Sequence, residues 1–345
     1  MKHRAVFLST AFLSAAGLVA VADPVGPVVT RMANGDVLIA QTTAPNTYHR
    51  IEASPDLETW QPLFTLRSSG ALNHTDSAAP YFGQRFYRVL PLATAPVLTG
   101  DHLATSAGEV VIHSVDHASF VMTWNGKTIY NDPVGGAAPY ANFPRADLIL
   151  VSHSHGDHFN GATLTAVLAT GGQIIAPQAV YNSLSAPLKA ATTIMLTGQT
   201  NPANNTPAQS VIGLTVEAIP AYNANHALGT GNGYVLTIDD QRLYMSGDTG
   251  DTAEMRALSN IDVAFVCMNV PFTMTIPQAV SAVRQFRPRV VFPYHYRNQN
   301  GSLADLAGFK QQVGTDLGIE VRLRPWYASE AAPQVKLRKK KKKRR

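Results

Sequence analysis

The run His153-Ser-His155-Gly-Asp157-His158 decides how this 345-residue chain is interpreted. It follows the apolar stretch Leu148-Ile-Leu-Val151, which predicts a buried strand that opens into a loop or helix. Imidazole and carboxylate are suitable ligands for a divalent metal such as zinc. One tetrahedral centre does not need four such side chains this close together, whereas two adjacent centres do. A polar turn with solvated histidines is the alternative, but three imidazoles would then crowd like charges near neutral pH.

Further metal-binding side chains stand at the ends of other strand-like segments. They are Asp132 in Ile129-Tyr-Asn-Asp132, His226 in Ala221-Tyr-Asn-Ala-Asn-His226, Asp248 in Leu243-Tyr-Met-Ser-Gly-Asp248 and His295 in Val290-Val-Phe-Pro-Tyr-His295. Together with the first run, and in the same order, these motifs resemble the metallo-β-lactamase superfamily over about residues 105 to 325. Four segments are similar to its lactonase-like and broadly defined metal-dependent hydrolase branch: Asp116-His-Ala-Ser-Phe120, Pro220-Ala-Tyr-Asn223, Gly247-Asp-Thr249 and Phe272-Thr-Met-Thr275.

That resemblance implies both the fold and the metal ligands. The fold would be α/β, an αββα sandwich of two facing mixed sheets with helices outside, and the ligands would gather along one edge. Two divalent ions are implied, with zinc favoured and manganese or iron(II) as alternatives. The first ion would be held by His153, His155 and His226 and the second by Asp157, His158 and His295, with Asp248 as the bridge. Asp132 would fix a ligand histidine from behind, and His117 would line the site.

Two neighbouring cations would make a hydrolytic centre. They would share one water and lower its pKa from about 16 to about 7, so that hydroxide between them attacks an ester or lactone carbonyl. Asp157 and Asp248 would therefore be catalytic as well as ligating. Four residues flank ligand histidines: Tyr222 or Tyr296 could donate to the developing oxyanion, and Asn223 and Arg297 could contact the substrate. Ordinary packing explains these four residues equally well.

Three other functions stay open at the level of sequence. Phosphodiester hydrolysis, including nuclease activity, uses the same metals but needs a phosphate clamp, for which the body of the chain offers mainly Arg297. β-Lactam hydrolysis is disfavoured because Asp248 occupies the place of a metal-binding cysteine, and Cys267, the only cysteine, lies in an apolar run. A surface-binding protein with a structural metal is the non-enzymatic alternative, although structural zinc usually has only four ligands.

The N-terminus predicts a signal peptide over residues 1–22. Lys2, His3 and Arg4 precede an apolar run, and Ala20-Val-Ala22 is an A-x-A cleavage site. A membrane helix is the alternative, but the small residues and the cleavage motif favour removal after Ala22. We therefore expect a secreted or periplasmic protein.

The net charge of +5 is concentrated at the two ends of the chain. Of the 28 Lys and Arg residues, 11 lie in residues 1–22 and 336–345, which leaves 17 against 23 acidic residues in the body. We expect a small-molecule substrate and no specific nucleic-acid partner. Residues 331–345 read as a disordered basic tail. The tail or the β domain could contact an anionic envelope or polymer, or the tail could be an artefact of the gene end; the oligomeric state stays open.

The chain divides into two units after the signal peptide. Residues 23–98 predict a small all-β, sandwich-like domain because short alternating runs are separated by Pro, Gly, Asn and Asp. The pattern from Tyr48 to Trp60, closing on Arg85-Phe-Tyr-Arg88, resembles the fibronectin-type-III-like modules of secreted bacterial proteins. Residues 91–96 read as a linker, and residues 99–330 as the catalytic domain.

Several elements of the catalytic domain are predicted from local signals. Asn125-Gly126 predicts a hairpin turn between residues 110–122 and 128–130. A helix over residues 162–169 should stop at Gly171-Gly172 before a strand over 173–176, and residues 198–210 should form a loop. Further helices are expected over residues 251–258, from a capping box at Thr275 to about Phe286, and from Ser302-Leu-Ala-Asp305.

Overall fold

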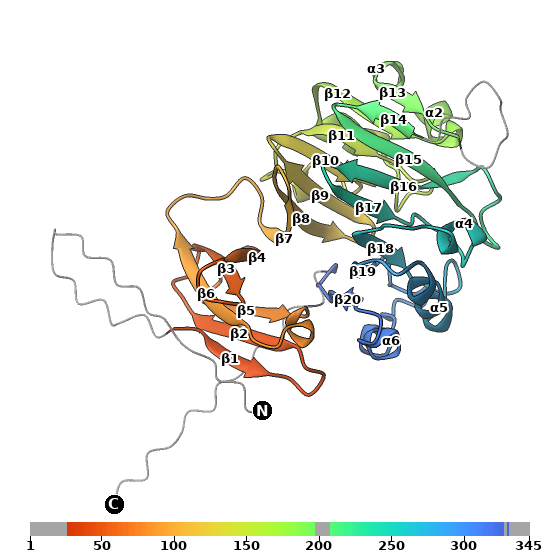
Figure 1. The fold of residues 1–345 in the computed structure, drawn as a ribbon. Coiled ribbons are helices and arrows are strands. Elements are labelled where there is room, and N and C mark those ends of the chain that lie inside the picture. The colour runs from red at the N-terminus through yellow and green to blue at the C-terminus, as the bar shows by residue number, and fades with distance from the viewer. Residues whose placement is uncertain (1–25, 197–207, 328–329, 331–345) are drawn as a thin grey trace, which may run out of the picture.

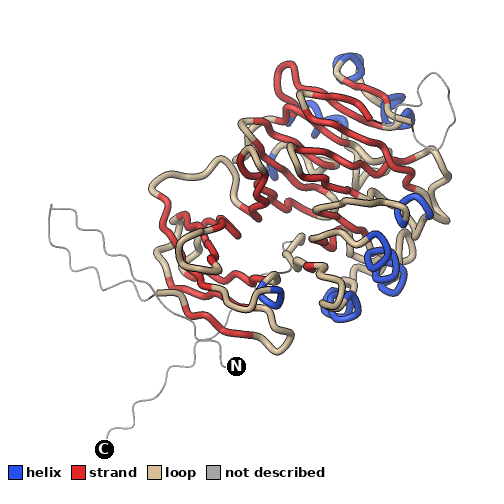
Figure 2. The backbone as a smooth tube through the Cα atoms, viewed as in Figure 1, coloured by secondary structure: helices blue, strands red, loops and turns tan. Residues whose placement is uncertain are grey.

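The computed structural model describes residues 26–196, 208–327 and 330. The predicted signal peptide, the basic tail and residues 198–207 of the predicted loop lie outside the described residues, so those predictions stay untested. Residues 208–210, which were also expected in the loop, instead belong to strand β14 (Ala208–Val211). Strands predominate, and the helices are short and lie at the periphery of the sheets (Figure 2). Within the described ranges, no helix is long and apolar enough to cross a membrane.

The N-terminal region is all β, as predicted. A three-stranded sheet in the order β1-β2-β5 faces a second layer formed by β4, β3 and β6 (Figure 1). Their shared core contains Ile39, Ile51 and Leu72, which are at most 1% exposed and alternate with outward side chains. The fibronectin resemblance stays a prediction. The bounds are β1 (Val28–Arg31), β2 (Val37–Thr42), β3 (Tyr48–Ser54), β4 (Gln61–Arg67), β5 (Ala71–Asp76), η1 (Ala79–Tyr81) and β6 (Phe86–Leu92).

The larger part of the chain confirms the αββα sandwich, with one addition. A ten-stranded mixed sheet has the order β13-β12-β11-β10-β9-β8-β7-β4-β3-β6, so it continues from the catalytic region into the N-terminal region through β4 and β7. The expected linker is shorter than predicted because Pro91 pairs with His49 inside β6. The remaining bounds are β7 (Gly100–Thr105), β8 (Gly108–Asp116), β9 (Ser119–Trp124), β10 (Lys127–Asn131), β11 (Ala146–Leu150), β12 (Leu168–Ala176) and β13 (Thr192–Ile194).

A seven-stranded sheet in the order β14 to β20 faces the first one. Buried side chains such as Phe120, Leu148, Val235 and Phe265 fill the space between the two sheets. Because these apolar side chains are removed from water, their packing between the two sheets stabilises the fold. The bounds are β14 (Ala208–Val211), β15 (Leu214–Ala221), β16 (Gly231–Ile238), β17 (Gln241–Met245), β18 (Val263–Cys267), β19 (Val290–Tyr294) and β20 (Glu320–Val321).

Helices cover the outer faces of both sheets. Leu164, Val180 and Leu188 pack on the outside of the ten-stranded sheet, while Val283 and Phe309 pack on the outside of the other. The outer elements are η2 (Ala138–Tyr140), α1 (Gly161–Val167), α2 (Gln178–Ser183), α3 (Ala186–Ala190), α4 (Ala253–Arg256), α5 (Ile276–Phe286) and α6 (Leu306–Val313).

Local predictions succeed where a turn or cap dictates the geometry. The Asn125-Gly126 hairpin joins β9 to β10, and the Thr275 capping box begins α5. The predicted strand over residues 110–122 is in fact two strands, which turn at residues 117 and 118. The helix before Gly171 ends at Val167, and both glycines lie inside β12. Helix α6 is capped by Asp305 rather than by Ser302.

Candidate metal centre

The predicted ligands converge at one edge of the sandwich because each follows the end of a strand. Asp132 follows β10 and His153 follows β11, and these two strands are parallel neighbours. Asp248 follows β17 and His295 follows β19, which belong to a parallel run through β18. The carboxyl ends of parallel strands meet at the same edge, so side chains far apart in sequence arrive together.

Three residues at this edge have a left-handed backbone conformation. The φ angles are 55° at His117, 42° at Asp132 and 48° at His295. Such conformations cost about 1–3 kcal/mol each for residues other than glycine, and they cluster at functional sites. The surrounding sheets therefore hold these three side chains in place against a local preference for other conformations.

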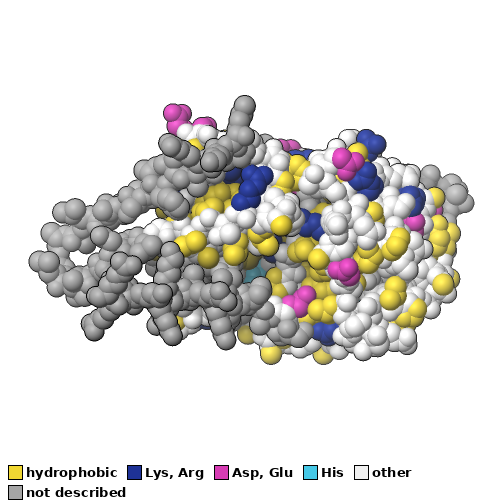
Figure 3. Space-filling model, turned by 90° about the horizontal axis from the view of Figure 1, so that it is seen from below, with side chains coloured by type: hydrophobic (Ala, Val, Ile, Leu, Met, Phe, Trp, Pro, Cys, Tyr) yellow, Lys and Arg dark blue, Asp and Glu magenta, His cyan; other side chains and the backbone are white. Residues whose placement is uncertain are grey.

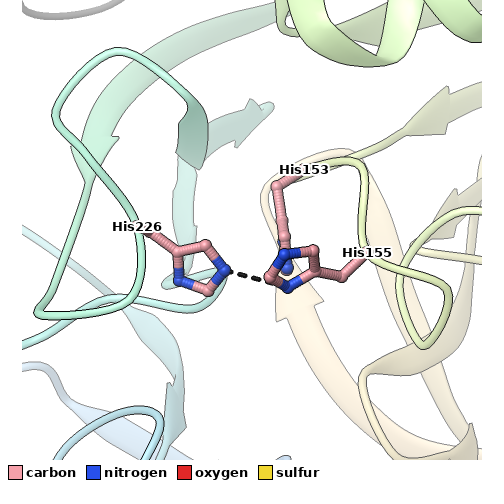
Figure 4. A group of neighbouring side chains, drawn as sticks. All are labelled: His153, His155 and His226. Carbon is pink, nitrogen blue, oxygen red and sulfur yellow. Dashed lines mark hydrogen bonds between the residues drawn. The ribbon is translucent and has the colours of Figure 1, made fainter.

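A first group consists of three histidines (Figure 4). His153 and His155 come from the loop after β11, and His226 faces them from the loop after β15. The Nε2 atom of His226 lies 3.0 Å from Nδ1 of His155, and the rings of His153 and His226 are 4.7 Å apart. Three imidazole nitrogens within 4.8 Å of one another can hold one divalent cation.

A second group lies beside the first and shares a carboxylate with it. The Oδ1 atom of Asp248 is 3.3 Å from Nε2 of both His158 and His295. Its Oδ2 atom lies 3.9 Å from Nε2 of His153, in the first group. Asp157 adds Oδ2 at 3.4 Å from His295 and 3.8 Å from His158. The predicted ligands are thus all brought together, and Asp248 stands between the two groups.

The chemistry of these donors fits a metal. Nε2 of His153, His158 and His295 and Oδ1 of Asp248 are buried and have no hydrogen-bond partner in the described part of the protein. A buried polar atom without a partner costs about 1–3 kcal/mol, so four at one place need a compensating ligand. A divalent cation supplies that compensation to nitrogen and oxygen alike.

Asp132 and Ser152 orient two of these histidines. Asp132 is fully buried, and its Oδ2 accepts from Nδ1 of His158 at 2.8 Å and from the Ser152 hydroxyl at 2.7 Å. Because the only proton of Ser152 goes to Asp132, its oxygen can accept from Nδ1 of His153, 3.0 Å away. With Nδ1 engaged in this way, both histidines turn Nε2 toward the centre. Asp132 was predicted for this position, whereas Ser152 was missed.

The charges of the centre shift the pKa values of its members. Burial, and then the neighbouring His158, lower the pKa of His153 to about 2. Burial alone would lower the pKa of His158, but the Asp248 and Asp132 carboxylates raise it well above its usual range. Burial would raise the pKa of Asp248, whereas His295 and His158 hold it well below the usual range. The carboxylate is therefore ionised and His153 is neutral, as metal ligands must be.

Three of the four predicted catalytic or substrate residues outside the ligand set are engaged elsewhere. The Tyr222 hydroxyl donates to Glu254 at 3.0 Å. Tyr296 is fully buried, and its hydroxyl donates to Glu330 at 2.5 Å. The structure therefore does not support an oxyanion contact from either hydroxyl. Asn223 accepts from the backbone N–H of His226 and donates to the carbonyl of Asp248. Its side chain therefore fixes the loop that carries His226 and is not free to bind substrate.

Arg297 and His117 both lie at the rim, together with a residue that the sequence did not reveal. The guanidinium of Arg297 lies 3.9 Å from the centre of the Tyr327 ring. The Tyr327 hydroxyl is 2.8 Å from Nδ1 of His117, whose Nε2 is 3.2 Å from Oδ2 of Asp157. Tyr327 lies more than 30 residues beyond the last motif, and no recognisable motif surrounds it. Substrate contact by Arg297 stays a prediction.

Comparison with known proteins agrees with this geometry. A family model described as the beta-lactamase superfamily domain matches residues 111–295, more than half of the chain. A UPF0173 metal-dependent hydrolase from Pyrococcus horikoshii is 31% identical over 229 residues, covering 63% of this chain and 97% of the relative. Its counterpart from Pyrococcus abyssi is 30% identical over 225 residues, covering 61% and 96%.

Two solved structures share the fold. One, assigned as a metal-dependent hydrolase from Parabacteroides distasonis, is 35% identical with a TM-score of 0.57, covering 65% of this chain and 97% of its own. The other, a metallo hydrolase from the archaeon Ignicoccus hospitalis, is 25% identical with a TM-score of 0.50, covering 62% and 94%. Fold and site thus define a metallo-β-lactamase-type metal-dependent hydrolase. The chain belongs to the UPF0173 family of that superfamily.

Proposed function

We propose that the protein is an exported hydrolase that opens ester or lactone bonds at a centre of two divalent cations, most simply zinc. The observation that carries the proposal is the convergence of buried, unpartnered ligand atoms from His153, His158, His295 and Asp248. When bound, two cations would act as Lewis acids and lower the pKa of a shared water to about 7.

The arrangement of the ligands favours two ions over one. Four groups of three side chains satisfy the distance requirement for a cation: one lies on the His153 side, two lie on the His158 side, and the fourth, which contains both histidines, spans the two sides. Asp248 has one oxygen toward each side. A carboxylate in that position sets the spacing between two cations, whereas a single structural ion would need only four ligands.

Residues around the centre orient the ligand side chains and supply no nucleophile of their own. Asp132 and Ser152 keep the Nδ1 protons of His158 and His153 turned away from the centre. Asn223 ties the His226 loop to the Asp248 backbone. Such supporting contacts keep ligand geometry within the narrow range that catalysis requires.

The charge of the protein favours a small substrate over a polyanion. Outside residues 1–22 and 336–345, acidic residues outnumber basic ones by 23 to 17. On the face shown in Figure 3, Lys and Arg side chains occur in small, separate groups and form no continuous basic surface. A nuclease needs a cationic track for the phosphate backbone. Contact of the tail with an anionic envelope is a separate proposal, which rests on composition alone.

An activity panel with the metal-loaded full chain tests the substrate class. We expect turnover of lactones and aryl esters to exceed that of β-lactams and bis-aryl phosphodiesters. Asp251→Asn serves as the control for a change of charge that removes no proposed ligand, because Asp251 pairs with Arg256 on α4. Faster turnover of the phosphodiester in the same preparation would replace the ester or lactone proposal with the phosphodiesterase alternative.

A further inference from the structure

The C-terminal segment 322–327 returns to the rim of the metal centre and is fastened there. Oε2 of Glu330 accepts from the backbone N–H of Trp326 at 2.9 Å and of Tyr327 at 3.1 Å, as well as from the Tyr296 hydroxyl. Trp326 and Tyr327 are each 2% exposed. The Tyr327 side chain is therefore held in one position by contacts that do not involve the metal ligands.

The hydrogen bonds around the Tyr327 hydroxyl fix the direction of its proton. Its oxygen accepts from the backbone N–H of Tyr296 at 3.2 Å and of Arg297 at 3.1 Å. A phenol has one proton to donate, and the remaining neighbour is Nδ1 of His117 at 2.8 Å. Because backbone N–H groups can only donate, the O–H of Tyr327 must point at His117.

That direction determines which nitrogen of His117 carries a proton. In the neutral imidazole one ring nitrogen accepts and the other donates. With Nδ1 accepting from Tyr327, Nε2 bears the hydrogen and donates to Oδ2 of Asp157 at 3.2 Å. The His117 ring cannot turn away freely, because its centroid lies 3.7 Å from that of His295 and its carbonyl accepts from the His295 N–H.

We propose that Tyr327 and His117 form a positioning relay that presents an N–H to Asp157, and that His117 is not a metal ligand. His117, Asp157 and His295 satisfy the distance requirement for a cation, so ligation by His117 is the competing assignment. The relay excludes it, because a protonated Nε2 cannot bind a metal. The inference rests on the proposed function only in treating Asp157 as a ligand.

Nitrogen NMR of histidine-labelled protein measures this relay directly. In zinc-loaded wild type we expect His117 to show a protonated Nε2 and an unprotonated Nδ1. In Tyr327→Phe, His117 should no longer be held in one tautomer. Tyr296→Phe is the control: it removes a hydroxyl that also binds Glu330 but does not contact His117, so the single tautomer should persist. A metal-shifted Nε2 of His117, or an unchanged tautomer in Tyr327→Phe, would overturn the relay.

Zinc competition provides a second readout, which holds even if Tyr327→Phe fails to fold. His117→Ala should weaken the weaker-bound zinc by about 10–100-fold. His117→Gln, whose amide can still donate to Asp157, should recover most of that loss. Equal affinity in all three proteins would also overturn the relay. Failure of the chain to bind any metal would instead contradict the proposed function, and the tautomer of His117 could still be measured in the metal-free protein.

Discussion

The metal centre and the joint between the N-terminal and catalytic regions are built in different ways. The centre is assembled from short motifs, each of which ends a strand, and six adjacent residues supply four of the ligands. The joint is assembled from single residues far apart in the chain, such as the pair Lys310 and Asp36, at 2.6 Å, and the pair Ser77 and Glu320, at 2.8 Å. The first kind of site leaves a pattern in the sequence, and the second does not.

The joint is a continuous piece of structure. β4 and β7 pair through Phe64 with Asp101 and Thr65 with Gly100, which joins the two regions into one sheet. The guanidinium of Arg324 lies 2.8 Å from Asp101. Whether residues 99–330 fold and work alone stays a prediction. Removal of the N-terminal region would leave β7 as an edge strand that pairs only with β8.

The largest effect should come from the bridging carboxylate. Asp248→Ala should lower kcat by orders of magnitude, because the two proposed cations lose the group that sets their spacing. Steady-state kinetics on metal-loaded protein, with circular dichroism as a check on folding, measures this. Near-normal kcat with both metals retained would show that Asp248 is not the bridge.

A smaller effect is expected from Ser152, which touches no proposed cation. Ser152→Ala removes the acceptor for Nδ1 of His153 and a donor to Asp132, and should weaken zinc binding by about 10–100-fold. Ser154→Ala, two residues along and exposed, is the matched control. Zinc affinities from chelator competition that agree for the two variants would remove Ser152 from the support of the centre.

A substitution at the joint should destabilise the fold without changing any proposed metal ligand. Gly100 has φ of 139°, and an added Cβ would lie 2.0 Å from the carbonyl oxygen of Ile112. Gly100→Ala should therefore lower the free energy of unfolding by about 1–3 kcal/mol while leaving zinc stoichiometry unchanged. Gly83→Ala, where an added Cβ meets nothing within 4 Å, is the control. Denaturant unfolding of both variants measures the difference, and equal stabilities would contradict the close approach at Gly100.

The smallest expected effect is on the pH dependence of stability. Burial would raise the pKa of Glu320, but Arg322, 2.8 Å away, holds it below the ordinary value of 4.5. The ionised form is thus favoured in the folded state, so its stabilisation is present above about pH 4.5 and is lost as the pH falls through the lower folded pKa. In metal-free protein, the stability difference between wild type and Glu320→Gln should shrink on acidification from pH 6. A stability difference that stays constant or grows on acidification would contradict this prediction.

These two regions also mark how far the sequence could predict the structure. The ligands His153 to His295 and Asp132 were found because the motifs that carry them resemble those of the metallo-β-lactamase superfamily, and the αββα fold was implied by the same resemblance. Ser152 and Tyr327 were missed because a lone hydroxyl carries no spacing pattern. The helix was extended toward Gly171-Gly172 because glycine usually ends helices.

The structure gives Gly172 another explanation. An added Cβ at Gly172 would lie 2.6 Å from the carbonyl oxygen of Ala146 on the neighbouring strand, so the absence of a side chain there serves strand packing. The pairing of β4 with β7 could not be predicted either, because it depends on which of many edge strands meet. Such long-range choices are decided by the packed core as a whole and not by a local preference.

The central claim is that seven side chains from four strand-end loops hold two metal ions. Elemental analysis of the full chain, after zinc supplementation and removal of loosely bound ions, tests it most directly. We expect close to two zinc ions per wild-type chain, and loss of the first-site ion when His153 and His155 are both replaced by alanine. No more than one tightly bound ion in the wild type, after zinc or manganese supplementation, would contradict the two-metal account.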